Sequence, residues 1–212
     1  MPVPAAADDV SVVCEDGPVT AADQRLGDLA ALDVVTDRLA AVLGEVGDHQ
    51  WGQPTPCEGW DVAALVDHVT GGNRFTVSVL AGRSAEQAMA DAIASFGDGH
   101  ASVGEATTAL AEQHAAFGRP GALDGTCDHL AGPLPTRTVL RLRLHDLIVH
   151  TWDVEQSLRP PADIPPAVVH WGLHELTTHG SLDAAGFGPD PEAGGRGPEP
   201  PQVRYLGRFG RL

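Results

Sequence analysis

Residues 144–153 decide the fold and read Leu144-His145-Asp146-Leu147-Ile148-Val149-His150-Thr151-Trp152-Asp153. Apolar residues recur around them at helical spacing, which predicts a helix from about Pro135 or Thr136 to Leu158, before Pro160 and Pro161. Asp146 and His150 are four residues apart, so they lie on one face of this helix, about 40° apart around its axis. This spacing allows two side chains to bind one ion.

A second motif precedes it by about eighty residues. It reads Pro54-Thr55-Pro56-Cys57-Glu58-Gly59-Trp60-Asp61, and Leu65-Val66-Asp67-His68 and Gly71-Gly72-Asn73-Arg74-Phe75 follow. We expect Asp61 to cap a helix that runs to about Leu80 and carries His68 on an apolar face. Each of the two glycines inside this helix costs roughly 1 kcal/mol, so they indicate a close helix–helix approach or a ligand against the backbone.

Two histidines and one aspartate could together hold a metal ion. His68, Asp146 and His150 would leave open coordination positions, which is typical of a catalytic rather than a structural site. A histidine on an apolar helix face is also often a hydrogen-bonded core residue, and this reading stays open at this point. His145 lies about 140° from His150 around the helix and is expected to be exposed or to neighbour the ligands. His170 and His174, again four residues apart, form the strongest rival pair.

The remaining chain predicts an all-α protein with long loops. Residues 1–19 are expected to be a mobile extension, 20–185 a helical bundle, and 186–212 a Gly/Pro-rich loop with a C-terminal tail. Within the bundle we predict a first helix from Thr20 to about Gly44 and a region from Ser84 to Phe117 that breaks near Gly97. A connector over 118–135 and a helix from Pro165 to His179 complete the assignment.

Composition excludes several function classes. The 212 residues carry a net charge of −16 without a basic stripe, so nucleic acid is not an expected partner. No apolar run is long enough for a membrane span and no signal peptide is recognisable, so we expect a cytoplasmic protein without a membrane partner. The chain has no lysine and its only asparagine is Asn73, which fits a GC-rich, actinomycete-like genome.

The two motifs together resemble the mycothiol-dependent maleylpyruvate isomerase-like proteins of the DinB-like metal-binding superfamily. The resemblance extends over about residues 22–210. It is carried by Trp51, Pro54-Thr55-Pro56-Cys57, Gly59-Trp60, Leu65-Val66, His68, Gly71-Gly72-Asn73-Arg74-Phe75, residues 133–153 and Leu206-Gly207-Arg208.

This resemblance implies an antiparallel four-helix bundle with one additional helix and a divalent metal on His68, Asp146 and His150. Zinc is the expected ion, with Ni²⁺ or Fe²⁺ as alternatives. It also implies a low-molecular-weight thiol, mycothiol in actinomycetes, that the metal binds as thiolate for isomerisation of, or S-transfer to, a small electrophile. Asn73 and Arg74 could orient a polar ligand, although a role in helix packing is the simpler interpretation. The protein would be a monomer or homodimer.

The chain departs from the family pattern at two points. It has Asp146 where the isomerase type generally has Glu, and we expect no counterpart of that type's C-terminal domain. Three other interpretations therefore stay open. They are non-haem iron chemistry on the same ligands, a thiol-independent metal-dependent lyase, isomerase or cyclase of secondary metabolism, and a non-catalytic metal-binding protein.

Overall fold

The computed structural model describes residues 26–97, 99–179 and 199–211, and these are almost entirely helical. The helices are α1 (Asp28–Leu43), α2 (Val62–Leu80), α3 (Ala85–Ala94), α4 (Val103–Gly118), α5 (Thr136–Leu158), α6 (Pro166–Thr178) and α8 (Pro201–Gly207). A 3-10 turn η1 (Ala122–Asp124) and two antiparallel two-residue strands, β1 (Thr126–Cys127) and β2 (Leu134–Pro135), lie in the connector before α5. The all-α prediction is confirmed.

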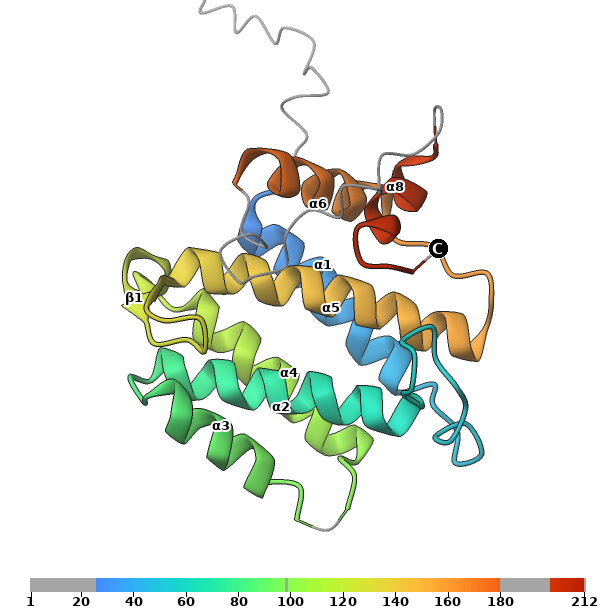
Figure 1. Cartoon of the computed structure of the whole chain (residues 1–212), viewed down its shortest axis with the longest axis horizontal. Helices are drawn as coiled ribbons and strands as arrows, with labels where there is room; N and C mark the ends of the chain where they lie inside the picture. The colour runs from blue at the N-terminus through green and yellow to red at the C-terminus, as the bar shows by residue number, and fades with distance from the viewer. Residues whose placement is uncertain (1–25, 98, 180–198, 212) are drawn as a thin grey trace, which may run out of the picture.

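Helices α1, α2, α4 and α5 pack against one another as a four-helix bundle. Along the chain, α1 to α5 alternate in direction; α3 returns the chain between α2 and α4, so these two bundle helices run the same way (Figure 1). Within the described residues, three further helices lie against the bundle, where the family resemblance implied one. Helix α3 packs on α2, while α6 and α8 pack together beside α1 and α5. No helix in the described part of the chain is both long and apolar enough to span a membrane.

Helix α5 lies at the centre of the hydrophobic core. Every residue of α5 from Leu144 to Glu155 is buried except Asp146, which is half-buried. Each buried leucine or valine contributes about 1.5–3 kcal/mol relative to an exposed one. The core therefore fixes both the axial position and the rotation of α5, and with them the direction of its two polar residues Asp146 and His150.

Most helix ends follow from local sequence signals. The side chain of Asp61 accepts a hydrogen bond from Ala64 N (2.9 Å) and caps α2, as predicted. Ser84 caps α3, and the break that follows contains Gly97 with φ +57°, a left-handed conformation that favours glycine. Helix α1 begins at Asp28 after Gly27, later than the predicted start at Thr20, which lies outside the described residues.

The C-terminal tail contains a short helix that the sequence did not predict. Pro201 to Gly207 form α8, with Pro201 in the first turn, where the missing N–H costs nothing. Tyr205 and Leu206 of α8 are fully buried in the main core. The expected extension over 1–19 and most of the loop predicted over 186–202 lie outside the described residues.

Candidate metal site

The three predicted ligands come together on the surface of the bundle. His68 Nε2 lies 3.1 Å from Asp146 Oδ1, and His150 Nε2 lies 3.4 Å from the same oxygen. One ligand atom from each residue can be chosen so that all three are within 4.8 Å of one another. In a tetrahedral zinc site with metal–ligand distances of about 2.0–2.1 Å, ligand atoms lie roughly 3.3 Å apart. Small side-chain rotations would therefore suffice to hold an ion.

The opposite directions of α2 and α5 explain why residues 78 positions apart meet. His68 lies in the second turn of α2, and His150 lies about two turns before the end of α5. Antiparallel packing brings these two levels together. The core residues Leu65 and Leu147, both fully buried, lock the rotation of the two helices.

Arg143 orients the carboxylate of Asp146. Its NH1 donates to Asp146 Oδ2 at 2.6 Å, which leaves Oδ1 directed toward both histidines. Two further acceptors fix the guanidinium: Asn73 Oδ1 at 2.7 Å and Gln113 Oε1 at 3.0 Å. Burial would raise the pKa of Asp146, but the charges of Arg143 and His150 outweigh it and hold that pKa well below its usual range. Asp146 is thus ionised, and one of its two carboxylate oxygens is left free of Arg143.

Gly72 makes room for this arrangement. A Cβ at this position would lie 2.5 Å from Arg143 NH1 and 2.9 Å from Arg143 Cζ. The glycine pair predicted a close contact between helices. At Gly72 this contact is made by the Arg143 side chain of α5, which lies against the backbone of α2. Gly71 is different, because its Cβ would meet only the Phe96 ring at an ordinary 3.4 Å.

His150 is held from its other ring nitrogen. Its Nδ1 lies 2.9 Å from Asp153 Oδ2, and Asp153 is completely buried. Burial would lower the pKa of His150, but the carboxylates of Asp146 and Asp153 raise it to about 9. A metal-binding histidine commonly donates its second N–H to a carboxylate in this way, which directs the free nitrogen at the ion.

The ligand set is open to small molecules on one side. The side chains of His68 and Asp146 are 39% and 27% exposed, and that of His150 is 9% exposed. Trp60 covers part of the site: its ring centroid lies 4.8 Å from that of His68 and 6.1 Å from that of His150. The donor set fits a divalent ion that keeps coordination positions for an exogenous ligand. Without an ion, the same atoms form a hydrogen-bonded His–Asp–His cluster.

The structure places the other predicted site residues around, not in, this cluster. Asn73 is fully buried and reaches the ligands only through Arg143. Arg74 points to the α4 side of α2, where it donates to Ser95 Oγ, stacks over Phe96 and lies 3.8 Å from Glu105. It lines a cavity of about 540 Å³ there with residues of α4.

The remaining histidine predictions have mixed outcomes. His145 does point away from His150, but it is buried and not exposed: it contacts Tyr205 Oη at 2.9 Å and Glu175 Oε2 at 2.6 Å. His170 and His174 are exposed on α6. Among the described residues, His68, Asp146 and His150 form the only group with metal-ligand geometry.

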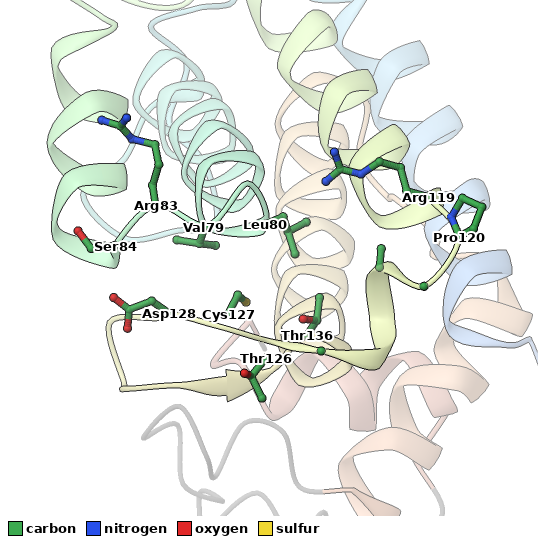
Figure 2. Close-up of a pocket in the computed structure, with 14 residues that line it drawn as sticks. Val79, Leu80, Arg83, Ser84, Arg119, Pro120, Thr126, Cys127, Asp128 and Thr136 are labelled. Carbon is green, nitrogen blue, oxygen red and sulfur yellow. The ribbon is translucent and has the colours of Figure 1, made fainter.

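A cavity of about 660 Å³ lies at the far end of α2 and at the start of α5. Figure 2 shows Arg83 and Arg119 on opposite sides of it, with Cys127 and Asp128 along the strand segment and Thr136 at the start of α5. None of the three ligands lines it. Two of its charged groups already have partners, since Asp128 accepts from Ala85 N and Arg83 pairs with Asp91. The cluster of His68, Asp146 and His150 is therefore the better candidate for chemistry.

Sequence reasoning missed four residues around the ligands. The sequence analysis assigned no contact with the predicted ligands to Arg143, Trp60, Asp153 or Arg211. The i, i+3 spacing of Arg143 to Asp146 and of His150 to Asp153 was a usable signal. For Arg211, which contacts Asp153 across 58 positions, the local sequence held no such signal.

Comparisons with known proteins find relatives of the chain in sequence and in fold. Two uncharacterized proteins of Mycobacterium tuberculosis, from strains CDC 1551 / Oshkosh and ATCC 25618 / H37Rv, are each 32% identical to the chain over 130 residues. The match covers 61% of this chain and 66% of each relative, slightly less than two thirds of their length. The crystal structure of a mycothiol-dependent maleylpyruvate isomerase with one histidine replaced by alanine shares the fold. Its TM-score is 0.55 at 18% identity, over 71% of this chain and 68% of that one.

The family model described as the mycothiol maleylpyruvate isomerase N-terminal domain matches residues 32–155, which include α2, α4 and all three predicted ligands. This match covers more than half of the 212 residues. The chain therefore belongs to the family of the mycothiol maleylpyruvate isomerase N-terminal domain.

Proposed function

We propose that the protein is a metal-dependent enzyme that uses a low-molecular-weight thiol, mycothiol, for isomerisation of, or S-transfer to, a small electrophile. The observation that carries this proposal is the convergence of His68, Asp146 and His150 on one point with an open side. Family membership supports the choice of thiol and of reaction class. Zinc is the proposed ion, because it favours mixed nitrogen and oxygen ligands in tetrahedral sites.

A bound divalent ion would lower the pKa of a thiol, so that the reactive thiolate forms at neutral pH. The protein residues prepare the site for it. His68 and His150 each offer one ring nitrogen, His150 after the ion has displaced its proton, and Asp146 offers one charged oxygen because Arg143 occupies the other. The Trp60 ring covers one side of the two imidazoles and so limits the access of water there.

The charge around the ligands favours an anionic thiol or substrate. Asp146 and Asp153 are each paired with an arginine, Arg143 and Arg211. The fixed charges of these two pairs cancel, so a divalent ion would leave the site with net positive charge. Anions are attracted to such a site although the whole chain is strongly acidic.

The first test is the metal content of the purified protein. Elemental mass spectrometry should give about one divalent ion per chain in the wild type and in the control His170→Ala, whose imidazole is exposed on α6. His68→Ala, Asp146→Ala and His150→Ala should each lose it. A wild type that stays metal-free after reconstitution with divalent ions would contradict the metal-dependent function.

The second test concerns the thiol. The metal-loaded protein is incubated with mycothiol and small electrophiles, including cis-configured unsaturated acids, and free thiol is followed together with product. An isomerase regenerates the thiol, whereas an S-transferase consumes one thiol per product. Turnover at the same rate without added thiol would contradict the thiol-dependent proposal and select a thiol-independent lyase, isomerase or cyclase.

A further inference from the structure

Asp153, the carboxylate behind His150, is shared with the C-terminal tail. On one side it contacts His150 Nδ1 at 2.9 Å. On the other side Arg211 makes a bidentate contact with it: Nε donates to Oδ1 at 2.8 Å and NH2 donates to Oδ2 at 2.9 Å. Asp153 has no exposed surface, whereas the side chain of Arg211 is 14% exposed. A buried carboxylate needs such a partner, and a two-bond guanidinium contact also fixes its orientation.

The tail is held in place independently of this contact. Tyr205 of α8 is fully buried, and its hydroxyl lies 2.9 Å from His145 Nδ1 on α5. Gln202 accepts from Ile164 N at 2.7 Å and donates to Ala162 O at 3.1 Å. These contacts hold α8 against the segment that follows α5. Arg211 comes four residues after the end of α8, so the position of this helix brings it to Asp153.

The guanidinium is charged and aligned. Burial would lower the pKa of Arg211, but its interactions with Asp153 and with the Cys57 thiol raise it. Arg211 NH1 also donates to the backbone oxygen of Phe209 at 2.9 Å. The guanidinium thus contacts the tail itself, Asp153 on α5 and the loop before α2.

We propose that Arg211 is a positioning residue of the metal site: through Asp153 it holds His150 with Nε2 directed at Asp146 Oδ1 and His68. The C-terminal tail thereby completes the site from outside residues 32–155, the part that matches the family model. The inference rests on the metal site of the proposed function. Its physical basis is that removing the partner of a ligand's supporting carboxylate leaves the imidazole free to turn, at a cost in metal affinity of about 10- to 100-fold.

The experiment measures Zn²⁺ affinity by competition with a chromophoric chelator. Arg211→Ala should bind Zn²⁺ at least about 10-fold more weakly than the wild type. Arg211→Lys should recover part of the loss, since it restores the charge but not the two-bond fork. The matched control is Arg204→Ala, which removes an exposed arginine from the same tail and should leave the affinity unchanged. The Co²⁺-loaded proteins should show a changed visible spectrum for Arg211→Ala only, because ligand geometry changes.

A variant pair tests whether Arg211 acts through Asp153. Asp153→Asn should weaken Zn²⁺ binding, and adding Arg211→Ala to it should cause no further loss. If Arg211→Ala does not fold, Arg211→Lys and Asp153→Asn carry the test. Wild-type affinity in Arg211→Ala, with at most a lower Tm, would overturn the inference and leave the tail a structural role. Absence of Zn²⁺ binding in the wild type would instead overturn the proposed function together with this inference.

Discussion

Arg143 is the residue on which the geometry of the ligands most depends. It donates to Asp146, Asn73 and Gln113 at once, and its side chain is only 11% exposed. These three side-chain acceptors and Val69 O, which lies 3.4 Å from NH2, surround the guanidinium and hold it in one orientation. The position of Asp146 Oδ1 is therefore set by a network that begins on α2 and α4, and not by the rotamer preference of an isolated aspartate.

Substitution of Gly72 tests this dependence. A methyl group there would lie 2.5 Å from Arg143 NH1 and would force the guanidinium away from Asp146. Gly72→Ala gains up to about 1 kcal/mol of helix propensity, but disrupting a buried charged network costs about 1–3 kcal/mol. We expect a net loss of stability in urea unfolding and weaker Zn²⁺ binding.

Gly71→Ala is the matched control, since its methyl group meets only Phe96 at 3.4 Å. It should raise the free energy of unfolding by up to about 1 kcal/mol. Equal stabilisation by both substitutions, with unchanged Zn²⁺ affinity in Gly72→Ala, would show that Arg143 can move without consequence.

At this scale the sequence predicted the three residues that the structure brings together, but not the residues that support them. Spacing placed Asp146 and His150 on one face of α5, and His68 followed as a histidine among apolar neighbours. The role of Arg143 depends on which way a long flexible side chain turns, and this is decided by acceptors 30 and 70 residues away. Local pattern contains no information on such a choice.

Among the elements, α5 was predictable and α8 was not. Helix α5 lies between proline-containing segments and has a continuous apolar pattern, so its predicted end at Leu158 is the observed one. Helix α8 has seven residues and follows a Gly/Pro-rich stretch, so its own propensity is weak. It is stabilised by burial of Tyr205 and Leu206 against the bundle, which only tertiary packing supplies.

The packing of α8 on α6 requires a glycine at position 172. A Cβ on Gly172 of α6 would lie 2.4 Å from Tyr205 Cε2 and 3.0 Å from Cζ. The Tyr205 ring is fully buried and cannot move aside, so Gly172→Ala should overpack this contact at a cost of about 1–3 kcal/mol. We expect a lower Tm and faster amide hydrogen exchange over residues 201–207.

The control is Gly104→Ala in the first turn of α4, where a Cβ would meet nothing within 4 Å. It should leave exchange in α8 unchanged. Unaltered exchange over residues 201–207 in Gly172→Ala would argue against tight packing of α8 on α6. It would also argue against the view that α8 positions Arg211 at Asp153.

For the whole molecule, metal binding and folding should be linked in a pH-dependent way. In the metal-free protein the pKa of His150 is raised from 6.5 to about 9 by Asp146 and Asp153, against the effect of burial. This raised pKa stabilises the fold below pH 6.5, and the contribution is lost as the pH rises through about 9. A metal ion requires the neutral imidazole, so it competes with this proton.

The increase in Tm on adding Zn²⁺ should therefore be larger at pH 8 than at pH 6.5. At a free Zn²⁺ concentration 100 times the Kd, binding adds about 2.7 kcal/mol, which corresponds to roughly 5–10 °C for a chain of this size. Removing the ion with a chelator should reverse the shift, and calorimetry should detect proton release during binding. His150→Ala should lose both the shift and its pH dependence, because the competing proton is gone together with the ligand. A Zn²⁺-induced shift that is the same at both pH values, or that persists in His150→Ala, would place the ion elsewhere on this acidic chain.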